Sequence, residues 1–330
     1  MTSPNPMHRK RPMARSAPLV LLATALALGL TAALAQAQFS RTYVSAASGS
    51  DGNSCGLGAP CRSFQRAHNQ TNDQGEITVL DSGDYTNPST SLTITKSISI
   101  VNDGGGEASI LVSGGFDGVT VNGGAGAYVN LRGITIQGVG SGNGIRFNSG
   151  FSLTITNCVV RNLTGFGIFF VPSANSNLSV SSTLVADNGL DGIVVQPIGS
   201  NVTVKVVLDR VEAYSSFRGL VVAGQFGTGS VNVTAVDSVA ANNADAGFTV
   251  FSATGKATTS LMVVRSVAAN NGTGLAMKGS PLTVRLGQSS VTGNTTSWQV
   301  TNGAVLQSYG DNDIDGNGDG NPAPPTISKK

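Results

Sequence analysis

Charged and aromatic residues are scarce in this chain of 330 residues. Asp, Glu, Lys and Arg make up 12% of it and aromatic residues 5%, with a single tryptophan. Four of the 20 Lys and Arg lie within the first 37 residues, so the rest of the chain carries 16 basic against 18 acidic side chains, a net charge of −2. Binding to nucleic acid calls for a clustered basic face, and the composition therefore does not favour a nucleic-acid partner.

Histidine is nearly absent as well. The chain holds two, His8 and His68, so a Ser-His-Asp triad or a histidine metal site outside the N-terminal segment would depend on His68 alone. No metal-ligand spacing surrounds it. We expect His68 to be a surface residue rather than a catalytic base.

Long apolar runs are missing except near the N-terminus. There a basic stretch precedes an apolar run at residues 19–34, and Ala-Gln-Ala at 35–37 supplies a small-x-small cleavage site. The run is shorter than the roughly 20 residues that cross a membrane. We expect 1–37 to be a cleaved signal peptide and the protein to be secreted or periplasmic, mature from about Gln38, with no membrane span.

Cysteine occurs three times. Cys55 and Cys61 lie close together in a polar loop, and in an exported chain a disulfide between them is the expected state. Cys158 occupies a position that other repeats fill with Thr or Ser, so we expect a small buried residue rather than a reactive thiol. The equivalent positions are Thr183, Ser238, Ser266 and Ser290.

What the chain does contain is one short pattern repeated between residues 128 and 300. A glycine followed by aliphatic-x-aliphatic recurs at intervals of 23, 25, 27, 28 and 27 residues. The six glycines are Gly144, Gly167, Gly192, Gly219, Gly247 and Gly274, and a degenerate copy of the pattern begins at Ser297. Such a period indicates repeats that bury their apolar faces against their neighbours.

Each repeat contains three short segments in which apolar and polar residues alternate, without helical periodicity between them. This is the pattern of strands with one buried face, and three of them form one coil of a parallel β-helix. A leucine-rich repeat would need a Leu-rich frame, and a propeller blade 40 or more residues. We predict an all-β, right-handed parallel β-helix (solenoid) of about ten coils over 77–320. Its interior stack is predicted to be Ile145, Ile168, Ile193, Leu220, Phe248, Leu275 and Trp298.

Asn and Asp recur after the second strand of each repeat, where we interpret them as turn formers that stack into a polar ladder rather than as ligands. One column aligns Asn162, Asp187, Tyr214, Asn242, Asn270 and Asn294. The next aligns Leu163, Asn188, Ser215, Asn243, Asn271 and Thr295.

The two ends of a solenoid need covers, because an open end exposes strand edges and core. We interpret 38–76 as an N-terminal cap with a strand around Tyr43 and a short helix between Pro60 and Asn69. Residues 305–310 are interpreted as a last coil, and 321–330, with three prolines and two lysines, as a disordered tail.

The first coils, ITVLDSGDY and LTITKSISI within 77–100, together with the Gly-Ile-x-Val coils, resemble the right-handed parallel β-helix proteins of the pectin-lyase-like superfamily over roughly 41–320. More narrowly, the chain is similar to small exported bacterial β-helix proteins without assigned activity. The resemblance implies the fold but carries no catalytic set. The Asn-Thr-Asp, Asp-Asp, Gly-His-Gly and Arg-x-Lys of similar hydrolases, the Arg-x-Pro-x-x-Arg of the lyases and the Asp-Phe-x-x-Gly of the esterases are all missing from the sequence.

Charged and aromatic side chains gather in two successive repeats, which form the candidate ligand surface. Tyr214 and Phe217 could stack on a sugar ring, and the carboxylates could serve two-carboxylate chemistry if about 5–9.5 Å apart. The alternative is a solvated turn region with ordinary surface ion pairs. The candidates are Asp187, Asp191, Asp209, Arg210, Glu212, Tyr214, Phe217 and Arg218.

Asp311, Asp313 and Asp315 match the first half of a calcium loop, but the twelfth position, a bidentate Glu in such loops, is Pro322. We favour a final coil with the same turn chemistry and expect no cofactor, with calcium only weakly indicated.

Taken together, the sequence favours an exported β-helix protein that presents an extended surface to a polysaccharide or a cell-envelope partner without catalysis. The alternative is a polysaccharide-active enzyme, whether lyase, hydrolase or epimerase, that uses carboxylates on the outer face of the helix.

Overall fold

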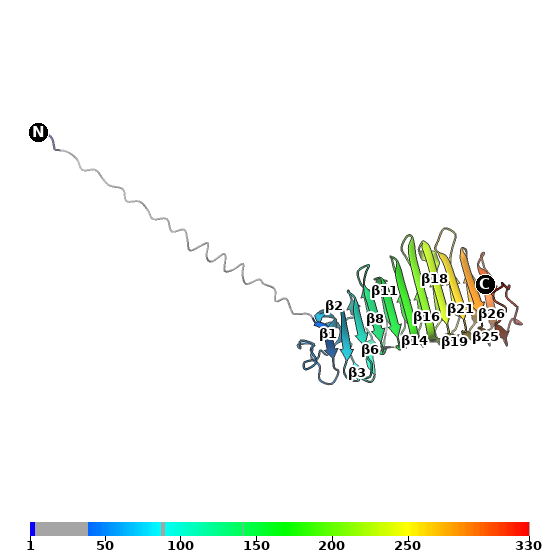
Figure 1. Ribbon diagram of the computed structural model, residues 1–330, viewed down its shortest axis with the longest axis horizontal. Helices are drawn as coiled ribbons and strands as arrows, with labels where there is room; N and C mark the ends of the chain where they lie inside the picture. Colours follow the sequence, from blue (N-terminus) through cyan, green and yellow to red (C-terminus); the bar gives the residue numbers. More distant parts are fainter. Residues whose placement is uncertain (4–38, 87–89, 141, 330) are drawn as a thin grey trace. The chain divides into compact units, whose positions relative to one another are not determined.

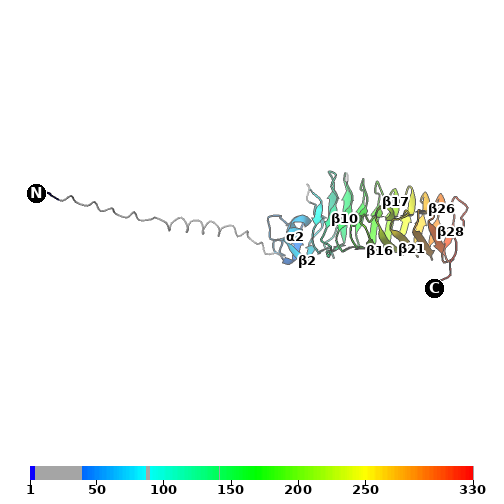
Figure 2. The same cartoon turned by 90° about the horizontal axis from the view of Figure 1, so that it is seen from above.

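The computed structural model describes residues 1–3, 39–86, 90–140 and 142–329, and the chain divides into two compact units, 1–37 and 38–330. Residues 4–37 of the predicted signal peptide lie outside the described residues. The second unit is a parallel β-solenoid of about nine turns. Figures 1 and 2 show its strands stacked one after another along the solenoid. The predicted β-solenoid is thus confirmed, with about nine turns where about ten coils were predicted.

Each coil contributes strands to three parallel ladders. Two of them, here called limb A and limb B, form one 19-stranded sheet because β14 and β16 run through both. The third is a separate nine-stranded sheet. Its order along the solenoid is β4, β7, β10, β13, β15, β17, β20, β23 and β26, so each coil adds one strand.

The strands of limb A are β1 (Phe39–Val44), β2 (Thr71–Val79), β5 (Ile98–Val101), β8 (Tyr128–Arg132), β11 (Ser152–Thr156), β14 (Ser176–Ala186), β16 (Val202–Tyr214), β18 (Gly229–Val236), β21 (Thr258–Val264), β24 (Leu282–Gly287) and β27 (Val305–Ser308). Limb B contains the second halves of β14 and β16 and β3 (Gly83–Asp84), β6 (Ala108–Val112), β9 (Ile134–Gly138), β12 (Val159–Arg161), β19 (Val239–Ala241), β22 (Val267–Ala269), β25 (Ser290–Thr292) and β28 (Asp313–Asp315). The nine-stranded sheet contains β4 (Leu92–Ile94), β7 (Val119–Asn122), β10 (Ile145–Ser149), β13 (Ile168–Phe170), β15 (Ile193–Val195), β17 (Arg218–Ala223), β20 (Ala246–Phe251), β23 (Thr273–Lys278) and β26 (Thr296–Thr301). A 3₁₀ turn, η1 (Gly224–Phe226), follows β17.

The interior stack follows the predicted register. Ile145 pairs with Ile168, and Ile168 with Ile193; the column continues through Leu220 to Phe248 and beyond. These side chains are at most 3% exposed, because alternate residues of a strand point to opposite faces and this face looks inward. The last member, Trp298, is partly buried at the C-terminal end.

A second interior feature is a ladder of buried asparagines at the corner after limb B. The amide of Asn243 donates to Asn271 Oδ1 at 2.9 Å, Asn271 donates to Asn294 at 3.0 Å, and Asn294 donates to Asn317 at 2.9 Å. Each oxygen also accepts the backbone N–H of the preceding asparagine. Backbone and side-chain polar groups are thereby satisfied together inside the core.

The structure corrects the predicted polar columns by one residue in two coils. Ser215 and Ser216 take the positions assigned to Tyr214 and Ser215, because Tyr214 is the last paired residue of β16. Likewise Asn294 takes the position assigned to Thr295.

In the column of Cys158, Ser289 replaces the predicted Ser290, since Ser289 Oγ accepts from Ser266 N at 3.2 Å. Cys158 itself is a buried free thiol, and burial raises its pKa to about 11.

The N-terminal end is covered by β1, a loop and helix α2 (Phe64–Gln70). The helix begins after Ser63, whose hydroxyl accepts from Arg66 N at 3.2 Å. Phe64 packs against Tyr85 with ring centroids 5.0 Å apart and the rings tilted by 35°, which places the helix against the first coil. The predicted disulfide between Cys55 and Cys61 is present in the loop.

The C-terminal end is formed by β26, β27 and β28. The predicted last coil at 305–310 corresponds to β27, and residues 321–329, for which we predicted a disordered tail, lie against it. Ser308 N donates to Pro325 O, and Ile327 N donates to Ser308 O, both at 2.8 Å. These bonds satisfy part of an otherwise open strand edge.

Candidate functional site

The eight predicted surface residues lie in separate places. Asp191, Phe217 and Arg218 come together at the entry to the nine-stranded sheet, where Arg218 Nε donates to Asp191 Oδ1 at 2.9 Å. Asp245, which the sequence analysis did not single out, lies one coil further, with Oδ2 3.8 Å from the same nitrogen. One arginine therefore holds two carboxylates from neighbouring coils.

Two aromatic rings contact this arginine. The Arg218 guanidinium lies 5.1 Å from the Phe217 ring centroid and 5.6 Å from that of Phe251, distances at which a cation is attracted to the ring face. We call Asp191, Phe217, Arg218, Asp245 and Phe251 the Arg218 cluster.

Asp191 is the buried member of the cluster, with 5% of its surface exposed. Burial raises the pKa of its carboxyl group, the positive charge of Arg218 opposes that rise, and the neighbouring Asp245 adds to it. Desolvation disfavours the charged form of a carboxyl group, so Asp191 binds its proton more tightly than a free aspartate.

An apolar patch continues from the cluster along the outer face of the nine-stranded sheet. Val194, Val221 and Ala223 are at most 3% exposed, although they point away from the interior. Half-buried phenylalanines cover them, and the Phe166 and Phe169 rings lie 4.5 Å apart. We call Phe166, Phe169, Val194, Val221 and Ala223 the outer patch.

A second arginine lies at the far side of the outer patch. Arg146 on β10 places its guanidinium 5.2 Å from the Phe169 ring centroid. Since β10, β13, β15 and β17 are successive strands about 4.8 Å apart, the two arginine–aromatic contacts lie roughly 14 Å apart across the strands.

The other five predicted residues face elsewhere. Glu212 and Tyr214 point outward from limb B, and the pKa of Tyr214 is raised by burial and by the neighbouring Glu212. Asp209 and Arg210 pair at the corner between limbs A and B, where Arg210 has a φ of 51°. Asp187 is an exposed turn residue with a φ of 55°. The eight predicted residues are close together in the sequence, but they lie on three different faces of the coil.

A simple signal could have identified the site. The residue before each repeat glycine points outward at the start of a nine-stranded-sheet strand, and this column contains Phe166, Asp191 and Arg218. The backbone bonds of successive glycines confirm the stacking, since Gly167 N donates to Asp191 O and Gly192 N to Arg218 O.

His68 is not the surface residue that we expected. It is 3% exposed, and its Nε2 accepts the backbone N–H of Thr95 at 3.3 Å while its Nδ1 contacts Asn69. Burial lowers its pKa. The helix turns this side chain onto the first coil, so its environment is that of a structural histidine.

The three aspartates near the C-terminus take separate partners. Asp311 pairs with Lys329 at 2.6 Å, whereas Asp313 and Asp315 belong to β28 and pair in register with Ser290 and Thr292. In the parts of the chain that the structure describes, no group of three or more Asp, Glu, His and Cys is arranged to hold a metal ion. Among the same residues, no helix is long and apolar enough to cross a bilayer.

No family model matches the sequence, and no curated protein matches it. Among solved structures, pectate lyase Pel9A aligns with a TM-score of 0.52 at 17% identity, covering 86% of this chain and 81% of the lyase. The A-modules of mannuronan C-5 epimerases AlgE4 and AlgE6 from Azotobacter vinelandii align with TM-scores of 0.42 and 0.45 at 14% and 17% identity. They cover 78% and 71% of this chain, and 91% and 71% of their own. The arrangement of ladders and the likeness to the lyase agree: this chain has the pectin-lyase-like parallel β-helix fold.

Proposed function

We propose that this protein is exported and binds a polysaccharide across the outer face of its nine-stranded sheet, without breaking bonds in it. The observation that carries the proposal is Arg218, held by Asp191 and placed within cation–π distance of the rings of Phe217 and Phe251. A fixed arginine beside aromatic and apolar surface offers both hydrogen bonds for sugar hydroxyls and flat contacts for sugar rings.

One nitrogen of the Arg218 guanidinium holds the side chain in place, and the other two remain as hydrogen-bond donors for a ligand. Its Nε is taken by the Asp191 carboxylate, and no hydrogen bond from the described residues occupies its two terminal nitrogens. Because the ion pair fixes the guanidinium plane, a ligand meets a preorganised donor pair and loses less conformational freedom on binding. The outer patch extends this surface towards Arg146.

The structural neighbours support the class of ligand. One is by name a pectate lyase and two are mannuronan epimerase modules, so the solved β-helices that this chain resembles include proteins that act on polysaccharides. The exported location rests on the predicted signal peptide.

A retention assay on immobilised polysaccharides tests the proposal with the protein purified after expression of the full chain. Phe217→Ala should weaken retention roughly 2–10-fold, the effect of an aromatic contact worth about 0.5–1.5 kcal/mol. Tyr128→Ala is the matched control, because Tyr128 is an exposed aromatic on limb A. Equal losses for the two variants, or no retention on any polysaccharide, would reject the proposed surface.

A second candidate function is a polysaccharide-active enzyme. Asp191 and Asp245 both approach Arg218 Nε, at 2.9 and 3.8 Å, so the two carboxylate oxygens lie at most about 7 Å apart, no further than the carboxylates of glycosidase pairs. Asp191, with its raised pKa, would be the acid. New reducing ends or unsaturated products that disappear in Asp191→Asn and Asp245→Asn would favour this function.

A further inference from the structure

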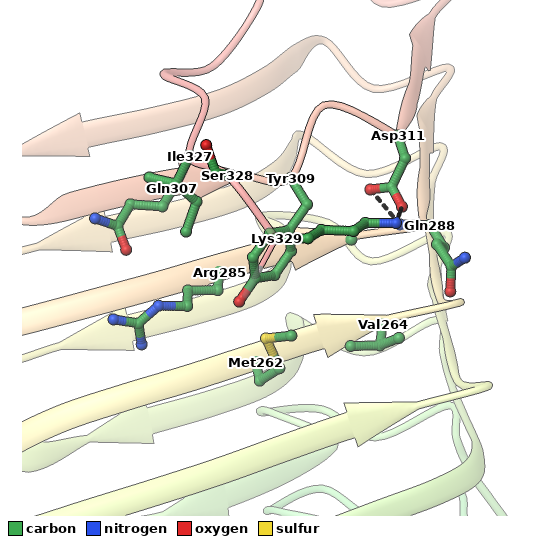
Figure 3. Close-up of a pocket in the computed structure, with 11 residues that line it drawn as sticks. Met262, Val264, Arg285, Gln288, Gln307, Tyr309, Asp311, Ile327, Ser328 and Lys329 are labelled. Atoms are coloured by element: carbon green, nitrogen blue, oxygen red, sulfur yellow. Dashed lines mark hydrogen bonds and ion pairs between the residues drawn. The ribbon is translucent and has the colours of Figure 1, made fainter.

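A groove separate from the Arg218 cluster opens on limb A, at the C-terminal end of the solenoid. Its volume is about 810 Å³. The floor is formed by outward side chains of β21, β24 and β27, among them Met262, Arg285 and Gln307, which are paired in register. Residues 327–329 of the C-terminal segment form one wall, as Figure 3 shows.

The charges in this groove do not cancel. Lys329 Nζ lies 2.6 Å from Asp311 Oδ2, which neutralises both. Arg285 is half-buried in the floor and has no ion pair or hydrogen bond among the described residues. Figure 3 shows it extended away from the Lys329–Asp311 pair. One positive charge is therefore left over, and an anionic group is the complementary ligand.

Apolar side chains line much of the remaining surface, together with the uncharged polar residues Gln288, Gln307 and Ser328. Tyr309 packs close over Gly287, where an added Cβ would lie 3.0 Å from the ring Cδ2. Met262, Val264 and Ile327 complete the apolar surface. Thioether and aromatic groups of this kind pack well on planar rings.

We propose that this groove binds a small aromatic carboxylate, with the carboxylate on Arg285 and the ring between Tyr309 and Met262. The volume is within the roughly 300–1,000 Å³ of small-molecule sites, and the lining combines apolar surface with polar groups that can fix the orientation of a ligand. The proposal does not depend on the polysaccharide surface, which lies on the nine-stranded sheet.

The methionines provide a reporter of binding at this site. Of the five in the chain, three lie in the first 13 residues, Met262 lines the groove, and Met277 is buried in the core at 2% exposure. In protein carrying ¹³C-methyl methionine, 2-naphthoate should shift the Met262 signal and leave that of Met277 unchanged. The uncharged 2-naphthamide should bind at least tenfold more weakly.

Three variants complete the test. Arg285→Gln should weaken 2-naphthoate binding at least tenfold. Lys329→Gln should also weaken it, because the negative charge of Asp311 is then no longer neutralised and repels the carboxylate of the ligand. Lys205→Gln, an exposed cation on limb A outside the groove, should leave binding unchanged. A Met262 signal that does not move, that moves equally with the amide, or that moves equally in Arg285→Gln would overturn the proposal.

Discussion

Arg218 Nε and Asp191 Oδ1 lie 2.9 Å apart across two coils, and the aspartate side chain is 8% exposed against 21% for the arginine. The pair joins loops that enter successive strands of the nine-stranded sheet. Because a buried charge that loses its partner is strongly unfavourable, the same contact that presents Arg218 to a ligand also holds the two loops together.

Arg218→Ala should therefore lower stability as well as ligand binding. We expect a loss of about 2–4 kcal/mol in the free energy of unfolding, near the range for breaking a buried ion pair. Asp191→Asn should cost less, because it removes the charge but keeps an oxygen that accepts from Arg218. Urea unfolding measures both.

Arg265→Ala is the matched control for that comparison. Arg265 Nε bonds Asp237 Oδ1 at 2.8 Å, again between coils, but the side chains are 52% and 39% exposed. An exposed pair contributes about 0–1 kcal/mol. If Arg218→Ala were no more destabilising than Arg265→Ala, the burial of Asp191 would not have the energetic role assigned to it.

Two adjacent asparagines in one turn should differ strongly in how much their substitution lowers stability. Asn271 is 3% exposed and bonds Asn243, Asn294 and Ala240, so Asn271→Ala leaves several buried groups without partners, at about 1–3 kcal/mol for each group. Asn270 has a φ of 56°, a conformation that glycine adopts freely.

Asn270→Gly should accordingly change stability by less than about 1 kcal/mol, whereas Asn271→Ala should lower it by about 3 kcal/mol or more. Thermal or urea unfolding of the two variants makes the comparison. Similar effects at both positions would contradict the ladder.

The fold followed from the sequence because the stacking column is visible as a periodic glycine and aliphatic pattern. Ile145, Ile168 and Ile193 lie one coil apart and are paired as predicted. The predicted alignment of the polar columns is wrong by one residue at Tyr214 and at Asn294. The coil length changes at these two places, and a turn position there can be matched to either of two polar neighbours.

The candidate site was predicted less well. Asp191, Phe217 and Arg218 meet, but Glu212 and Tyr214 lie on limb B, because a corner between them and Phe217 turns the chain towards another face. Phe251 was missed since it is about 30 residues distant in sequence and reaches Arg218 only through the pairing of β17 with β20.

The interior stack makes its own prediction. Ile193 is fully buried, so Ile193→Asp places an unpaired charge in the core, which is too costly for the folded state to tolerate. We expect loss of the β-sheet circular dichroism signal and rapid digestion by trypsin. Val207→Asp is the control, since Val207 points outward from β16 and is 47% exposed; a folded, trypsin-resistant Ile193→Asp protein would contradict the register.

The N-terminal cap should be the acid-sensitive part of the molecule. Asp81 accepts from Ser45 Oγ at 2.5 Å, from Tyr85 OH at 2.6 Å and from the backbone of Ala46 at 2.6 Å. Burial raises the pKa of Asp81, but the hydrogen bonds from Ser45, Tyr85, Ala46 and Ala47 together outweigh it and lower the pKa to about 2.

The sign of the effect follows from linkage. A carboxyl group with a lowered pKa in the folded state stabilises the protein above its unfolded value of 3.8 and loses that contribution as the pH falls towards 2. Asp81→Asn should therefore be less stable than the unmodified protein at pH 7, and the difference should shrink between pH 4 and pH 2. Urea unfolding at pH 7, 4 and 2.5 measures it, with Asp103→Asn, at an exposed ion pair with Arg132, as control. A difference that stays constant over this range would show that the Asp81 charge does not hold the cap, because only an ionised carboxylate can lose its contribution by protonation.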